Sequence, residues 1–356
     1  HTTTPPPPAS INDFLERMKQ VVCPQNFPED KIRQPQSEPP VAVPNGEFMG
    51  EGQFVGREDT LKVLLGYWAL RMKVSQKTNH VLNDPVDNAH VATQGAPGTG
   101  KSRLLHELMK MSKTGIPQSL IDYIKTPQSD EAESHWSSDL VPSDIDALSE
   151  KLKKTVPLLA TFNCFSPYVQ DVDTSPARSL SVRMLASYYL DLQNANDDAH
   201  FKKFRDMVLP LLGNQSDPVL FAVKAILQAS GKDAVMVCVD ELKNFAENEG
   251  LRGAIDISHQ IGLLLSASWG NQLVFTLETT LDSAIILNAD SDSGKKIWWV
   301  PLKSLIIEAI KMFNFPQQLL VAMENLPKAT TTSSSSKGLK RTGSTLGNLD
   351  RQSRVA

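Results

Sequence analysis

The string G-A-P-G-T-G-K-S at residues 95–102 constrains the fold of this chain more than any other part of the sequence. Its glycines allow the backbone to turn so that successive N–H groups point inward, where they can bind phosphate oxygens. Residues 90–93, just before the string, have the apolar character of a short buried strand, and residues 103–111 have helical spacing. The sequence therefore predicts a strand, a phosphate-binding turn and a helix, one after another.

The string matches the pattern G-x-x-x-x-G-K-[ST], in which each polar position has a chemical role. Lys101 would place a positive charge at the β- and γ-phosphates of a nucleoside triphosphate, and the Ser102 hydroxyl would ligate Mg²⁺. The dipole of the helix that begins here would add to phosphate binding. The alternative is a glycine-rich turn without a ligand. The expected nucleotide-binding residues are Gly95, Ala96, Pro97, Gly98, Thr99, Gly100, Lys101, Ser102 and Arg103.

A second motif lies at residues 234–241, where six apolar residues precede Asp240 and Glu241. Such a run is typical of a strand that is covered on both faces of a parallel sheet. Asp240, at the carboxyl end of the strand, would bind Mg²⁺ directly or through water, and Glu241 would act as general base on the attacking water. The alternative is a strand that meets solvent at an acidic turn. The E-L-K string at 241–243 also resembles half of a nuclease motif, but no convincing upstream Asp strand accompanies it.

Weaker candidates surround these motifs. Thr276, near the end of a predicted strand at 272–277, could hydrogen-bond the attacking water or the γ-phosphate, and Thr279 is the alternative for this role. An arginine that stabilises the transferring phosphoryl group could be Arg178, Arg183 or Arg252, although a structural role suits Arg183 better. Arg57, after the apolar residues 54–56, could face the nucleotide or simply begin a helix.

The order of predicted elements indicates a doubly wound, mostly parallel α/β sheet of the P-loop NTPase type with flanking helices. Further strands are expected at 157–163 and 298–299, and helices at 59–74, 144–154, 176–192, 201–212, 218–230 and 251–265. Residues 1–50 are rich in proline and are expected to be a disordered arm, with a short helix at 11–22 that frays in solvent or binds a partner. The NTPase domain is expected at 51–310 with an irregular insertion at 113–140, followed by a helical extension at 311–328 and a disordered, Ser/Thr-rich basic tail at 329–356.

Composition excludes several classes of function. The 356 residues carry a formal net charge of −4, so charge gives no support for nucleic-acid binding. The three cysteines have no C-x-x-C spacing, which excludes a disulfide framework. No apolar stretch approaches 18 residues, so no membrane span is expected.

Several strings together resemble a known class of ATPase. F-V-G-R-E at 54–58, G-A-P-G-T-G-K-S at 95–102 and V-C-V-D-E at 237–241 resemble the ATPase module of the AAA+ and STAND classes. T-F-N at 161–163, R-M-L-A-S-Y-Y-L at 183–190 and T-L-E-T-T-L-D-S at 276–283 are similar to the NTPase region of Crinkler-type and retrotransposon-hot-spot proteins. The resemblance covers about residues 50–310. It implies ATP rather than GTP as the nucleotide.

The family commonly joins this module to an effector domain, and some of its members are secreted and enter host nuclei. After residue 328 this chain has a low-complexity tail in place of an effector domain. A cytoplasmic or nuclear location is therefore favoured, with export implied only by the resemblance. We expect Mg²⁺-dependent ATP hydrolysis coupled to a conformational or assembly change, with a protein partner or a second copy of the chain. The alternative is a nucleotide-gated binding module with negligible turnover.

Overall fold

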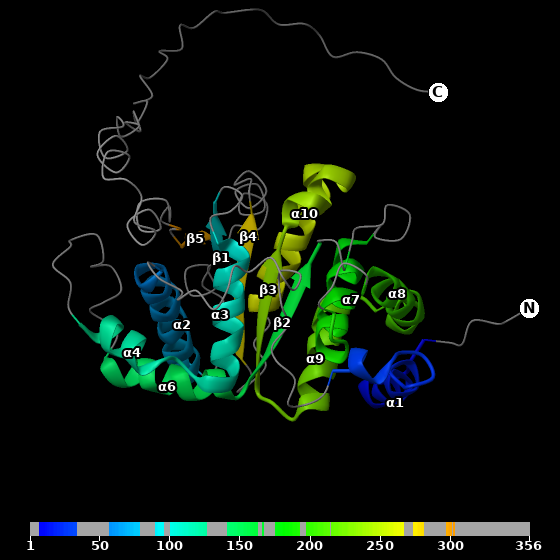
Figure 1. Cartoon of the computed structure of the whole chain (residues 1–356), viewed down its shortest axis with the longest axis horizontal. Coiled ribbons are helices and arrows are strands. Elements are labelled where there is room, and N and C mark those ends of the chain that lie inside the picture. The colour runs from blue at the N-terminus through cyan, green and yellow to red at the C-terminus, as the bar shows by residue number, and fades with distance from the viewer. Residues whose placement is uncertain are drawn as a thin grey trace, which may run out of the picture. The chain divides into compact units, whose positions relative to one another are not determined.

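Five parallel strands form a sheet in this computed structural model (Figure 1). Across the sheet their order is β2-β3-β4-β1-β5, with bounds β1 (His90–Gln94), β2 (Thr155–Thr161), β3 (Ala234–Asp240), β4 (Leu273–Thr280) and β5 (Ile297–Trp299). This arrangement confirms the α/β class and the parallel sheet that the sequence predicts. The structure describes residues 7–33, 57–78, 90–95, 100–126, 141–162, 166, 175–192, 197–213, 215–266, 273–280, 297–300 and 302.

The central strands are buried along their whole length. All seven residues of β3 and all eight of β4 are buried, as expected for strands that helices cover on both faces. The register places Val239 of β3 beside Glu278 of β4, and Thr279 of β4 beside Thr93 of β1. The carboxyl ends of these three strands therefore lie at one edge of the sheet.

Helices cover the two faces of the sheet and form two hydrophobic cores. Alternate residues of β3 point to opposite sides, so that Val237 packs in one core and Cys238 in the other. One face carries α2 (Glu58–Thr78), α3 (Lys101–Thr114), α4 (Gln118–Lys125) and α6 (Pro142–Lys153) (Figure 1). The other carries α1 (Ile11–Val21), α7 (Pro176–Tyr189), α8 (Asp198–Leu212), α9 (Pro218–Ser230) and α10 (Leu242–Ser266).

The path of the chain creates a point where the direction of winding reverses. From β1 the chain passes through α3, α4 and α6 to the far edge strand β2, and then returns through β3 and β4 to the side of β1. The helix α3, which follows β1, and the helix α10, which follows β3, lie on opposite faces. In open α/β sheets, ligands bind in the crevice that such a reversal leaves at the carboxyl ends of the strands.

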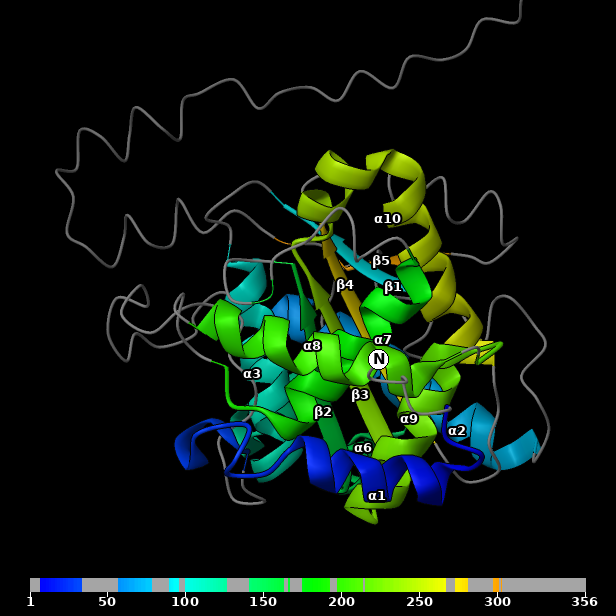
Figure 2. The same cartoon turned by 90° about the vertical axis from the view of Figure 1, so that its right-hand side faces the viewer.

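The expectation of a disordered arm at 1–50 is wrong for residues 7–33, which are folded. The helix α1 packs against α8 and α9, on the side of these helices that faces away from the sheet (Figure 2). Its residues Phe14, Met18 and Val21 are buried, and the Phe14 ring meets Phe221 of α9 edge-on, with 5.1 Å between ring centroids. The prolines that suggested disorder lie on either side of this helix and do not interrupt it. The proline content of the segment therefore does not prevent the apolar face of α1 from packing against the core.

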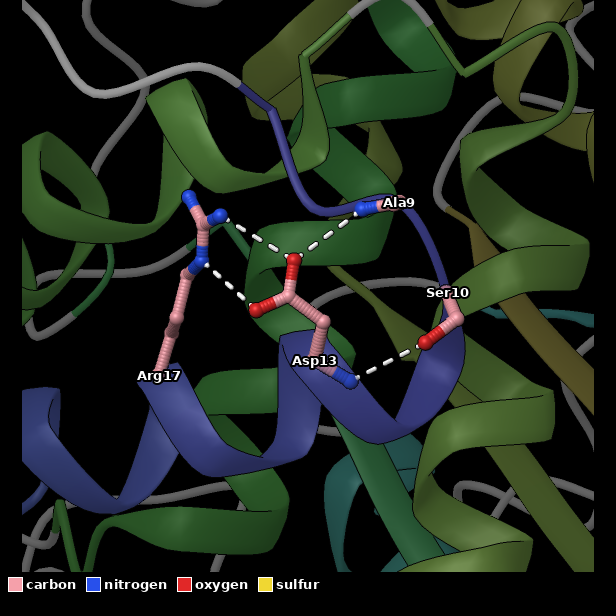
Figure 3. A network of polar contacts seen from close by, with 4 residues as sticks. All are labelled: Ala9, Ser10, Asp13 and Arg17. Atoms are coloured by element: carbon pink, nitrogen blue, oxygen red, sulfur yellow. Dashed lines mark hydrogen bonds and ion pairs between the residues drawn. The ribbon is translucent and has the colours of Figure 1, made fainter.

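The first turn of α1 is closed by a network of polar contacts (Figure 3). The Ser10 hydroxyl caps the helix by accepting the Asp13 N–H at 3.2 Å. The Asp13 carboxylate accepts the Ala9 N–H at 3.0 Å and the Arg17 guanidinium at 3.0 and 3.1 Å. The hydrogen bond from Arg17, followed by the one from Ala9, lowers the pKa of Asp13. These contacts show that the N-terminal segment has ordinary helix-capping chemistry.

Other boundaries also differ from the sequence expectations. The expected irregular insertion at 113–140 includes α4, whose Leu120 and Ile121 are buried, while 127–140 lie outside the described residues. The helix α10 begins at Leu242, nine residues before the expected start at 251. The expected regions 311–328 and 329–356 lie outside the described residues. Within the part of the chain that is described, no helix combines the length and apolar character needed to cross a membrane.

Candidate functional site

The carboxylate of Asp240, at the end of β3, is the centre of the candidate site. The Ser102 hydroxyl, at the start of α3, donates to Asp240 Oδ2 at 2.6 Å, although 138 residues separate the two. The Thr279 hydroxyl of β4 and the Glu241 N–H, at 3.0 Å, both donate to Asp240 Oδ1. Asp240 is almost fully buried, so these donors replace the water that an ionised carboxylate would otherwise bind. Three segments of chain thus converge on one acidic group.

The turn between β1 and α3 brings Lys101 to the same edge. The Lys101 ammonium donates to the Gly95 carbonyl at 2.7 Å, and the Gly95 N–H donates to the Thr280 carbonyl at 3.3 Å. Gly100 caps α3 with φ 83° and ψ 24°, a left-handed conformation that glycine adopts without strain. Ala96, Pro97, Gly98 and Thr99 lie outside the described residues. The described ends of the turn are therefore held in place by the sheet and by the lysine.

The charge on Lys101 depends on two opposing effects. Its side chain is half-buried, and this partial loss of hydration lowers its pKa. The negative charges of Asp240 and Glu241 oppose that shift. The ammonium group and the two carboxylates thus form an electrostatically coupled cluster at the winding reversal of the sheet.

Glu241 has a strained backbone. It is the one residue other than glycine with a positive φ, 59°, in the described part of the chain. This conformation turns its N–H back toward Asp240, while its side chain is exposed. Left-handed backbone costs a side-chain-bearing residue about 1–2 kcal/mol, and such strain is found mainly at functional sites. The turn from β3 into α10 therefore keeps Glu241 accessible beside the buried Asp240.

The structure distinguishes between the two threonines that the sequence offered. Thr279 contacts Asp240, whereas Thr276 faces the other side of the sheet, since it alternates with Thr279 and shares its face with Glu278. Glu278 accepts a hydrogen bond from Ser258 of α10 at 2.7 Å, which identifies that side. The buried Thr276 hydroxyl has no hydrogen-bond partner among the described residues. The register of β4 against β3 pairs Val239 with Glu278, so the next residues, Asp240 and Thr279, lie side by side on the same face of the sheet. That register would have favoured Thr279 over Thr276.

Three of the arginines that the sequence singled out have partners in the described residues: Arg103, Arg178 and Arg183. Arg103 pairs with Glu107 on α3 at 2.7 Å. Arg178 donates to the Gly213 carbonyl, and Arg183 is buried and donates to the Thr161 carbonyl at 3.1 Å, which agrees with the structural role expected for it. Arg252 is exposed on α10. Arg57 is buried just before α2, where burial lowers its pKa.

The donor set at Asp240 suits a hard divalent cation. The Ser102 hydroxyl and the Asp240 carboxylate present two oxygens 2.6 Å apart, and Mg²⁺ prefers oxygen ligands. In the described ranges no group of three or more His, Cys, Asp or Glu residues converges as a metal cage. Mg²⁺ is usually held by one or two protein oxygens, with phosphates and water completing its shell. The residues present therefore fit Mg²⁺ bound together with a phosphate ligand.

Comparisons of the chain with protein-family models, with curated proteins and with solved structures found no match. The class of protein therefore has to be inferred from the fold and the site. The fold is α/β with an all-parallel sheet. At the point where the winding of the sheet reverses lie Lys101, Ser102, the buried Asp240 and the exposed Glu241.

Proposed function

We propose that this chain is a P-loop NTPase that binds ATP with Mg²⁺ and hydrolyses it, and that hydrolysis drives a conformational or assembly change. The observation that carries the proposal is the hydrogen bond between Ser102 and Asp240. The sequence identified these residues separately, one in a phosphate-binding turn and one after an apolar strand. Their contact supports a single site to which both motifs contribute, as nucleotide binding requires.

Phosphate binding would rest on the turn and on Lys101. The ammonium group now held by the Gly95 carbonyl lies at the end of a flexible side chain, and it can move a short distance to the β- and γ-phosphates. The N-terminus of α3, beginning at Lys101, adds the N–H groups of its first turn and its dipole. A nucleotide would thus replace a contact between the ammonium and a neutral carbonyl with hydrogen bonds to anionic phosphate oxygens, in which donor and acceptor are both charged.

Metal binding and hydrolysis would use four residues: Ser102, Asp240, Thr279 and Glu241. When bound, Mg²⁺ would neutralise charge on the phosphates. Ser102 and Asp240 would hold it, and Thr279 keeps the Asp240 carboxylate oriented by its hydrogen bond to Oδ1. Glu241 would accept the proton of the attacking water, which its exposure permits. The AAA+ and STAND resemblance of these strings agrees with this division of roles.

A phosphate-release assay at saturating MgATP tests the proposal. The wild type should turn over, and Glu241→Gln should retain ATP binding while its rate falls by roughly 10²–10⁴, the usual effect of losing a positioned base. Gln keeps the size of the side chain but cannot accept the proton. An unchanged rate in Glu241→Gln, with a wild type that hydrolyses ATP, would show that another group activates the water.

One observation favours a second candidate function, a nucleotide-gated binding module with negligible turnover. Of the three arginines proposed to stabilise the transferring phosphoryl group, Arg178 and Arg183 are held by backbone carbonyls, and Arg252 is exposed on α10. Isolated P-loop NTPases often hydrolyse slowly when no arginine stabilises the transferring phosphoryl group. In that case ATP would bind without appreciable phosphate release, and light scattering with and without nucleotide would detect a change of shape or assembly.

A further inference from the structure

The last three residues of β4 contact three different parts of the molecule around the candidate site. The Glu278 carboxyl group accepts a hydrogen bond from the Ser258 hydroxyl of α10 at 2.7 Å. The Thr279 hydroxyl donates to Asp240, and the Thr280 carbonyl accepts an N–H from the start of the phosphate-binding turn at 3.3 Å. Glu278 thus connects α10 to the strand end that also holds the buried aspartate and the turn.

The Glu278 carboxyl group is fully buried on the face of the sheet that α10 covers. Around it α10 contributes Ala254, Ile257 and Ile261 to the hydrophobic core. A buried carboxyl group costs free energy unless it is hydrogen-bonded, and an apolar side chain of similar size would pack here without that cost. Apolar packing has no preferred direction, whereas a hydrogen bond fixes both a distance and an angle. The Ser258–Glu278 hydrogen bond therefore fixes the position of α10 along β4 more narrowly than the apolar contacts can.

The helix that this hydrogen bond fixes is the one that begins directly after Glu241. Its first residue, Leu242, is buried in the same hydrophobic core as the middle of the helix. Near the other end, Arg71 of α2 donates to the Leu265 carbonyl of α10 at 3.1 Å and to the Val274 carbonyl of β4 at 2.6 Å. A shift of α10 against β4 would therefore move Leu242, and with it the turn that carries Glu241.

The turn at Glu241 needs support from its surroundings, because its φ of 59° is left-handed. Such strained conformations persist only where the surrounding structure holds them in place. On one side of the turn Asp240 Oδ1 accepts the Glu241 N–H at 3.0 Å, and on the other side lies α10. We propose that Glu278, through its hydrogen bond with Ser258, is a positioning residue that holds α10 where the Glu241 carboxylate meets the attacking water. This inference rests on the proposed role of Glu241 as the base in ATP hydrolysis.

Phosphate release and calorimetric titration with MgATP, both on the full chain, test the proposal. Ser258→Ala should lower kcat by about 10- to 10²-fold, because a misplacement of about 1 Å can cost 10² in rate. Its affinity for MgATP should stay within about twofold, because the proposed phosphate contacts of Lys101 and the turn do not involve α10. Glu278→Gln should keep most of kcat, since the amide oxygen still accepts from Ser258, and Glu278→Met should behave as Ser258→Ala. The matched control is Thr276→Val, which removes a buried hydroxyl without a hydrogen-bond partner from the same face of β4 and should leave kcat unchanged.

The decisive comparison repeats Ser258→Ala in a chain that already carries Glu241→Gln. If Ser258 acts through Glu241, its substitution should not lower the rate that remains without the base. A role limited to stability would lower the rates of both parents by the same factor, and that result would overturn the proposal, as would an unchanged kcat in Ser258→Ala. If Ser258→Ala does not fold, Glu278→Met gives the same comparison.

The wild type separates this inference from the proposed function. A wild type that binds MgATP but releases no phosphate would contradict hydrolysis and the positioning role together. A wild type that hydrolyses ATP at a rate insensitive to Ser258→Ala and Glu278→Met would contradict the positioning role alone.

Discussion

The positive φ of Glu241 gives a prediction in which stability and activity change in opposite directions. A residue with a Cβ pays about 1–2 kcal/mol in the left-handed region, and glycine does not. Glycine also lowers the free energy of unfolding by about 0.4–1 kcal/mol, because it gives the unfolded chain greater conformational freedom. Because the Glu241 side chain is exposed, its removal loses little stabilisation from buried surface. Glu241→Gly should therefore stabilise the protein by about 0.5–1 kcal/mol.

Glu241→Ala is the matched control, because alanine keeps the Cβ and with it the strain. Urea denaturation of the three proteins should give a free energy of unfolding that is highest for Glu241→Gly, with equal m-values. Both variants should lose phosphate release, since neither has the carboxylate. Higher stability together with lost activity is the pattern expected when backbone strain is retained for function.

The reasoning would be refuted if Glu241→Gly were no more stable than Glu241→Ala. That result would mean that the backbone at this position does not adopt the left-handed conformation in solution. The exposed placement of the glutamate beside Asp240 would then need another explanation.

Four further changes test separate parts of the account. Phe14→Ala should lower the free energy of unfolding by about 3–5 kcal/mol in urea, because the ring is fully buried against α9. Thr276→Val should leave phosphate release unchanged and raise stability by up to about 1 kcal/mol, since it removes a buried hydroxyl without a partner. Thr279→Val should instead slow phosphate release and cost about 1 kcal/mol of stability, because Asp240 loses a hydrogen bond. ATP affinity, measured by calorimetry, should fall as the pH rises, because the neutral amine of Lys101 no longer attracts phosphate. The fall should begin below the ordinary lysine pKa of 10.5, because burial lowers the pKa of Lys101.

Each of these predictions has a contradicting outcome. If Phe14→Ala were as stable as the wild type, α1 would not pack on the domain, and the N-terminal segment would be the disordered arm that its composition suggested. Equal effects of the two threonine substitutions on phosphate release would remove the distinction between the two faces of β4. An ATP affinity that stays constant until the pH exceeds 10.5 would mean that Lys101 is better hydrated than its position indicates.

The parts of the site that could be predicted from sequence are those that short strings encode. The strand before Gly95, the helix that begins at Lys101 and the acidic end of β3 depend on local residue types, so these elements were predicted within a few residues of their observed bounds. Their meeting at one edge followed from the rule that parallel strands bind ligands at their carboxyl ends. Local chemistry and a simple topological rule therefore sufficed for these residues.

The remaining features depend on contacts between distant segments. The helix α1 is stable because α8 and α9 offer it an apolar surface, and proline content reveals nothing of that surface. The choice of Thr279 over Thr276 depends on the register between β3 and β4, which no local pattern states. Arg183 appeared as a polar residue within a helix, and its role at the edge of β2 follows only from the packing of α7.

Calorimetric titration with MgATP of the wild type, Lys101→Ala and Lys110→Ala tests the central claim most directly. Lys110 lies on the same helix but is only partly buried, and its ammonium is 3.8 Å from Glu107, so its substitution controls for the loss of one lysine from α3. We predict that the wild type and Lys110→Ala bind MgATP with similar affinity, and that folded Lys101→Ala shows no measurable binding. Equal binding by all three proteins, or no binding by the wild type, would contradict a nucleotide site at the meeting point of Lys101, Ser102 and Asp240.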